Sequence, residues 1–153
     1  MWTLVGFGEH AARTLPQIIF KDADWFFWGF ENGVFSKNYR LAVEAETIHR
    51  RATSIVPPYD DQGRPLGVEY LVDRTSGRFA GLQFVPASIV GPGNRYSDRI
   101  DLSVPRQLND YDKTGYNILM GDLKELLFGS RSARATRSRC EEFFDVEGNF
   151  LTP

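Results

Sequence analysis

The sequence predicts an α+β domain in which several helices pack against a small, largely antiparallel sheet. Residues 36–55 and 111–129 repeat apolar side chains at spacings of three and four, which is typical of amphipathic helices. Residues 66–88 and 99–106 instead alternate apolar and polar side chains, as half-buried strands do. Because helices precede and follow the strands, we expect an α+β order within one domain, residues 1–153.

The N-terminal part is predicted to contain a strand and two helices. Residues 1–7 are expected to form a strand that leads into a turn. Residues 21–33 favour a short helix, with Asp22 as its N-cap and Gly33 at its end. This helix is apolar nearly all round, so we expect its aromatic side chains to be buried. These side chains are Trp25, Phe26, Phe27, Trp28 and Phe30.

The C-terminal part is predicted to contain a hairpin, a strand and two helices. The hairpin spans residues 66–88, and a single strand follows at residues 99–106. A helix over residues 111–129 ends at Gly129, which can adopt the left-handed conformation of a C-cap. Residues 131–144 are expected to form the last helix.

Composition excludes several classes of protein. Eighteen cations against twenty acids leave a net charge of −2, so the overall charge does not indicate a nucleic-acid binder. Cys140 is the single cysteine, which excludes an intrachain disulfide and favours the reducing cytoplasm. The N-terminus has no signal-peptide pattern and no apolar run of membrane-spanning length exists, so we expect no membrane association.

The turn at residues 8–13 is the first candidate binding element. It follows the predicted strand, a place where loops often carry function. His10 and Arg13 are its candidate binding residues. Glu9, however, has the wrong sign for a turn that grips phosphate.

A basic stretch, "GSRSARATRSRC", is the second candidate. Arg131, Arg134 and Arg137 would share one arc of the predicted last helix, away from Cys140. Arginine forks suit phosphate or carboxylate groups. The alternative is a solvated helix face whose arginines pair with Glu141 and Glu142.

Catalysis has little support in the sequence. Asp101, Asp110 and Asp112 raise the possibility of a metal-dependent hydrolase, but capping of the following helix explains the last two. Cys140 falls on an apolar helix face, and His49 is expected on the surface. No Cys or His pair has zinc-ligand spacing and no phosphate-binding loop is present, so we predict no catalytic residue, metal or cofactor.

The chain resembles a bacterial family of quorum-sensing-regulated virulence factors. That resemblance covers nearly the whole chain, and it implies no established mechanism. The stretches that carry it are "FGEHAARTLPQIIFKDADWFFWGFENGVF", "IDLSVPRQL", "YDKTGYNILM", "LKELLFG" and "RCEEFFDVEGNF". About the first 35 residues also resemble the small C-terminal module of exonuclease X-like proteins, in which an F-G-K-H-K-G-K-x-L turn precedes a helix with an aromatic pair.

The exonuclease-like resemblance implies nucleic-acid binding, but the turn departs from its pattern. Glu9 and Ala11 stand where cations are expected, Ala12 replaces a glycine, and Arg13 alone stays cationic. Each lost phosphate contact lowers the salt slope of DNA binding by about 0.9. We therefore expect a non-catalytic cytoplasmic interaction module that binds another protein. Weak nucleic-acid binding is the alternative, and a metal-dependent hydrolase comes third.

Overall fold

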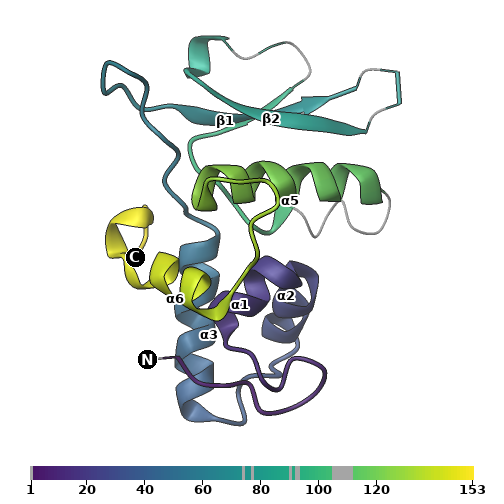
Figure 1. Cartoon of the computed structure of the whole chain (residues 1–153), viewed down its shortest axis with the longest axis vertical. Helices are drawn as coiled ribbons and strands as arrows, with labels where there is room; N and C mark the ends of the chain where they lie inside the picture. The colour runs from purple at the N-terminus through teal and green to yellow at the C-terminus, as the bar shows by residue number, and fades with distance from the viewer. Residues whose placement is uncertain (1, 74, 77, 90, 92–93, 105–111) are drawn as a thin grey trace.

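A computed structural model describes residues 2–73, 75–76, 78–89, 91, 94–104 and 112–153. A three-stranded sheet lies over one long helix, and the remaining helices gather on the other side of that helix (Figure 1). The described elements confirm an α+β architecture with an antiparallel sheet.

The helical half begins with a helix that the sequence analysis missed. Helix α1, Leu15–Lys21, has Pro16 in its first turn, where a missing N–H costs no hydrogen bond. Asp22 then ends α1 and caps α2, Ala23–Glu31, by accepting a hydrogen bond from the Trp25 amide. The predicted Asp22 cap is thus confirmed, although it separates two short helices.

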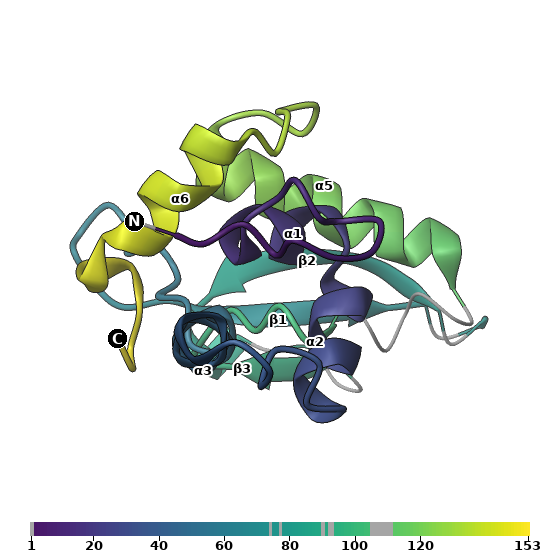
Figure 2. The same ribbon diagram turned by 90° about the horizontal axis from the view of Figure 1, so that it is seen from below.

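Helix α3, Tyr39–Ala52, is the amphipathic helix that the apolar spacing predicts. Its buried residues are Leu41, Ala45, Ile48 and Ala52. Asn38 caps its start by accepting from the Leu41 amide. Figure 2 shows α3 nearly end on, beside α2, and Figure 1 shows it below the sheet.

The sheet has the order β2-β1-β3, with both pairings antiparallel. Strands β1, Gly67–Val72, and β2, Phe79–Val85, confirm the predicted hairpin. The third strand, β3, Arg95–Ser97, lies before the segment in which a strand was predicted. The strand prediction for residues 99–106 is wrong for the described part, because Ile100 makes only an isolated bridge with Ile55.

Helix α5, Lys113–Phe128, packs along one face of the hairpin (Figure 1). Asp112 caps it from a buried position, because its carboxylate accepts from the amides of Gly115 and Phe79. One side chain thereby joins the helix start to β2. Gly129 ends α5 in the left-handed conformation, as predicted.

The segment that follows β2 contains the short 3-10 helix η1, Ala87–Ile89, and its described part lies on the side of the sheet opposite α5 (Figure 1). The buried Glu69 carboxylate accepts from the Gln83 side chain, the Gly91 amide and the Asn94 side chain, at 2.6, 2.6 and 2.9 Å. These hydrogen bonds hold the pKa of Glu69 below its usual value. This segment is therefore fastened to the sheet by an ionised carboxylate.

Three further predictions are corrected. Residues 1–7 form no strand among those described, and Leu4 makes only an isolated bridge with Thr14. Trp28 is 48% exposed rather than buried, because Phe26 and Phe27 fill the inner face of α2. The last helix, α6, Arg137–Asp145, begins six residues later than predicted, since the Thr136 hydroxyl caps it.

Phe20 of α1 joins the two halves of the molecule. Its ring centroid lies 5.0 Å from that of Phe128 of α5, and 5.8 Å from those of Phe143 and Phe144 of α6. Phe144 in turn stacks on Phe150, which follows the 3-10 helix η2, Glu147–Asn149. One continuous core therefore runs through the described helices and the inner face of the sheet.

Among the described residues, no helix combines the length and the apolar character that a bilayer crossing needs.

Gly67 is predicted to be required by close packing between β1 and β3. A Cβ atom at this position would lie 2.6 Å from the Ser97 carbonyl oxygen and overlap the Tyr96 side chain. We expect Gly67→Ala to lower the free energy of unfolding by about 1–3 kcal/mol in urea denaturation. Gly148→Ala is the control, since nothing lies within 4 Å there. Equal effects of the two substitutions would contradict this account.

Candidate functional site

The turn at residues 8–13 is tied to the start of α2 through a buried histidine. His10 is 4% exposed, and its Nε2 lies 3.0 Å from an Asp22 oxygen. Arg13 Nη1 lies 2.7 Å from His10 Nδ1. A guanidinium can only donate, so Nδ1 accepts and the proton sits on Nε2, which donates to Asp22. Both predicted binding residues of the turn are thus engaged inside the molecule.

The same turn also gathers three side chains of metal-ligand type. Glu9, His10 and Asp22 each offer one ligand atom, and these atoms lie within 4.8 Å of one another. A cation would need the Nε2 lone pair, but the Arg13 hydrogen bond keeps the proton on that atom. The Arg13 charge would also repel a cation. This arrangement suits a turn held by hydrogen bonds better than a metal centre.

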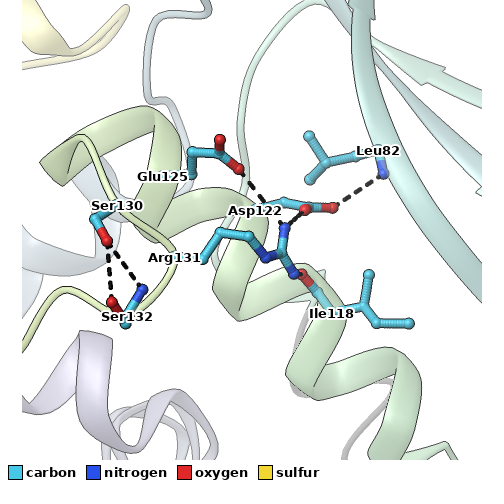
Figure 3. Close-up of polar contacts among 7 residues, drawn as sticks. All are labelled: Leu82, Ile118, Asp122, Glu125, Ser130, Arg131 and Ser132. Carbon is cyan, nitrogen blue, oxygen red and sulfur yellow. Dashed lines mark hydrogen bonds and ion pairs between the residues drawn. The ribbon is translucent and has the colours of Figure 1, made fainter.

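The basic stretch is not one surface. Arg131 and Arg134 precede α6, so the three arginines do not share a helical arc and that prediction is wrong. Arg131 reaches back to α5, where it pairs with Asp122, lies 3.8 Å from a Glu125 oxygen and contacts the Ile118 carbonyl (Figure 3). Asp122 also accepts from the Leu82 amide of β2. Arg131 therefore serves to hold the segment after α5.

Arg137 is also paired. Its Nε donates to Glu141 one turn along α6, at 2.7 Å, and the Thr14 hydroxyl donates to the same carboxylate oxygen. Arg137 therefore belongs to the contact between α6 and the start of α1. For Arg137, the structure therefore agrees with the alternative interpretation of the basic stretch, in which its arginines pair with Glu141 and Glu142.

Arg134 lies at a cavity between α1, α5 and the segment before α6. The cavity has a volume of about 680 Å³, within the usual range of ligand pockets. Its lining residues are Gln17, Phe20, Lys21, Tyr116, Asn117, Met120, Lys124, Ser132, Ala133, Arg134, Ala135 and Thr136. The Gln17 side-chain amide donates to the Ala135 carbonyl oxygen and holds this segment against α1.

Three cations and no acid line this cavity. Lys21 comes from the end of α1, Lys124 from α5 and Arg134 from the segment before α6. Within the described part of the chain, no ion pair joins any of the three to a carboxylate. Sequence reasoning found Arg134 but missed both lysines, because single lysines on separate helices leave no pattern.

The chemistry available in the cavity is binding rather than catalysis. Phe20, Tyr116 and Met120 supply an apolar wall, and Asn117, Ser132 and Thr136 supply neutral polar groups. Burial raises the pKa of Tyr116, so its hydroxyl stays protonated near neutral pH. The cavity can therefore hold an anionic group beside an apolar one.

Cys140 lies on the buried face of α6 and is 0% exposed, which confirms its predicted apolar position. Burial raises the pKa of its thiol to about 12, although the charges of Lys21 and Lys124 act in the opposite direction. The thiol is therefore protonated and unsuited to act as a nucleophile.

The acidic residues considered for a hydrolase have local roles where they are described. Asp112 is the buried cap of α5. Asp101 accepts from the Ser103 amide two residues later. Asp110 lies outside the described residues.

His49 is not the plain surface residue that was expected. Its ring stacks on that of Phe30, with centroids 4.3 Å apart and planes inclined by 17°. Burial lowers its pKa from the ordinary value, against the smaller effects of the Asp101 and Glu31 charges. The residue therefore belongs to the contact between α2 and α3.

Comparisons with known proteins returned no match among protein-family models, curated proteins or solved structures. The resemblances to the virulence-factor family and to exonuclease X-like proteins therefore stay predictions.

Stability is predicted to fall as acid protonates His49. Its folded-state pKa lies below its unfolded-state value of about 6.5, so the unfolded chain binds the proton first as the pH drops. We expect urea midpoints to decrease from about pH 7 toward about pH 5.5, where most carboxylates are still ionised. His49→Gln should flatten this part of the profile. An unchanged slope in the variant would assign the effect to other groups.

The Cys140 thiol is predicted to be inert in the folded protein. At about pH 8 a chromogenic disulfide reagent should react with it only as fast as the protein unfolds, because the buried thiol is protonated. In denaturant the reaction should be complete at the rate of a free cysteine. Rapid labelling of the native protein would contradict the burial of this side chain.

Proposed function

We propose that this chain is a non-catalytic interaction module that binds an anionic segment of another protein in the α1–α5 cavity. The observation that carries the proposal is the gathering of Lys21, Lys124 and Arg134 around one cavity without a lining carboxylate. Elsewhere, Arg131 and Arg137 are paired with acids of their own chain. No acid of the lining balances the three cations, so the opposite charge is supplied by a ligand.

The lining also favours a peptide over a bare inorganic ion. Met120 and the edge of Phe20 offer apolar contact, and the Asn117 amide can both donate to and accept from a peptide backbone. Residues 132–136 form one open wall of the cavity. A short acidic stretch could place its charged groups on the cations and its carbon atoms on the apolar wall.

A cytoplasmic location belongs to the same proposal. The single cysteine is a free, buried thiol, and the chain needs no disulfide for the core described above. This agrees with a reducing compartment.

The proposed site is tested with two fluorescein-labelled hexapeptides, one of glutamate alone and one with a central phosphoserine. We expect binding in fluorescence anisotropy. Lys124→Gln and Arg134→Gln should each weaken it about tenfold, the effect of losing one charge-assisted contact. Lys37→Gln is the matched control, because Lys37 is exposed and does not line the cavity.

Three results would overturn the proposal. The first is no binding of either peptide at low salt, and the second is equal losses in all three variants. The third is tighter binding of single-stranded oligothymidylate with the same dependence on Lys124 and Arg134. That third result would establish the nucleic-acid alternative in place of a protein partner.

A further inference from the structure

The charge of the cavity lining distinguishes between the two kinds of anion that proteins carry. Lys21, Lys124 and Arg134 bring three positive charges from three separate elements, and the lining contains no acid. One carboxylate supplies a single negative charge. A phosphate monoester supplies about −1.5 to −2 and three acceptor oxygens near neutral pH.

Building on the proposed function, we infer that the ligand of this cavity is a phosphate monoester carried by the partner segment. Lys21 of α1 and Lys124 of α5 both act by their charge on the Cys140 thiol behind the cavity, so these two charges lie near one point. A phosphate monoester brings its charge in one compact group, whereas separate carboxylates would each need their own backbone position. Three cations around one cavity therefore favour phosphate.

Neutral groups of the lining complete the set of donors. The Thr136 hydroxyl accepts from the Arg139 amide, which leaves its own proton free to donate into the cavity. The Asn117 amide offers two more N–H groups. Charged and neutral donors together exceed the three acceptor oxygens of a phosphate monoester.

Arg134 is the residue of this site whose side chain can bind two phosphate oxygens at once. Arg139 donates to the Arg134 carbonyl oxygen at 3.1 Å and lies over the Phe128 ring, which fixes the backbone at Arg134. A guanidinium binds two phosphate oxygens side by side, whereas an ammonium binds as a point charge. Arg134 therefore orients the phosphate, and the two lysines attract it by their charge.

The ligand's own titration gives the sharpest test. The titratable and charged groups that face the cavity are Lys21 from α1, Tyr116 and Lys124 from α5 and Arg134 from the segment before α6. Cys140 of α6 lies behind them, and the charges of Asp22 and Asp24 act on Tyr116. Between about pH 5 and 8, lysine and arginine stay charged, and tyrosine and a buried thiol stay neutral. A phosphate monoester gains its second charge near pH 6. A pH dependence in this range that the equally labelled glutamate peptide does not share would therefore come from the phosphate.

The experiment compares the phosphoserine and glutamate hexapeptides at about pH 5 and about pH 7.5 by fluorescence anisotropy. The phosphopeptide should bind about tenfold more tightly at the higher pH, as its dianion fraction rises, whereas the glutamate peptide should change by about twofold or less. Arg134→Gln should reduce the gain, and Lys37→Gln should leave it unchanged. Inorganic phosphate should compete more weakly than the phosphopeptide, because it makes no contact with the apolar wall.

Two outcomes would overturn the inference and leave the proposed function standing. One is equal affinity for the two peptides at about pH 7.5, and the other is a flat pH profile for the phosphopeptide. Failure of both peptides to bind would instead remove the proposed function together with the inference. A variant that loses binding is interpreted only if its urea midpoint matches that of the unchanged protein.

Discussion

The packing of Phe20 is the contact on which the arrangement of this molecule depends. Its ring is buried between Phe128 of α5 and the Phe143–Phe144 pair of α6, so one side chain of a seven-residue helix holds together elements far apart in the sequence. A helix as short as α1 is not stable alone and needs such packing. Because Phe20 also lines the cavity, the same contact sets the spacing between the lysines of α1 and α5.

Six cations of this chain form two groups, according to whether their side chains bond within the protein. Arg13, Arg131 and Arg137 each bond to a neighbouring side chain and fix a turn or a helix start. Lys21, Lys124 and Arg134 instead face a cavity that no carboxylate lines. A surface ion pair contributes little to stability, so Arg131 and Arg137 mainly set local geometry. The second group carries the proposed binding, because none of its members forms an ion pair with a carboxylate of the described residues.

The turn at residues 8–13 shows how a motif can keep its form while serving the fold. His10 is held between Arg13 and Asp22, and its ring lies edge-on to Trp25 with centroids 4.9 Å apart. Asp22 in turn caps α2. The histidine thus fastens the turn to a helix start, and the structure gives it a positioning role that its loop location alone did not indicate.

The sequence by itself determined the α+β class, the hairpin, the long helices α3 and α5, and the buried Cys140. These features follow from local periodicity and from caps such as Asp22 and Gly129, which act within a few residues. Helix α1, the place of β3 and the late start of α6 were not found, because short elements gain their stability from distant contacts. The cavity was decided by tertiary structure alone. Its three cations lie on different elements, and only the packing around Phe20 brings their charges together.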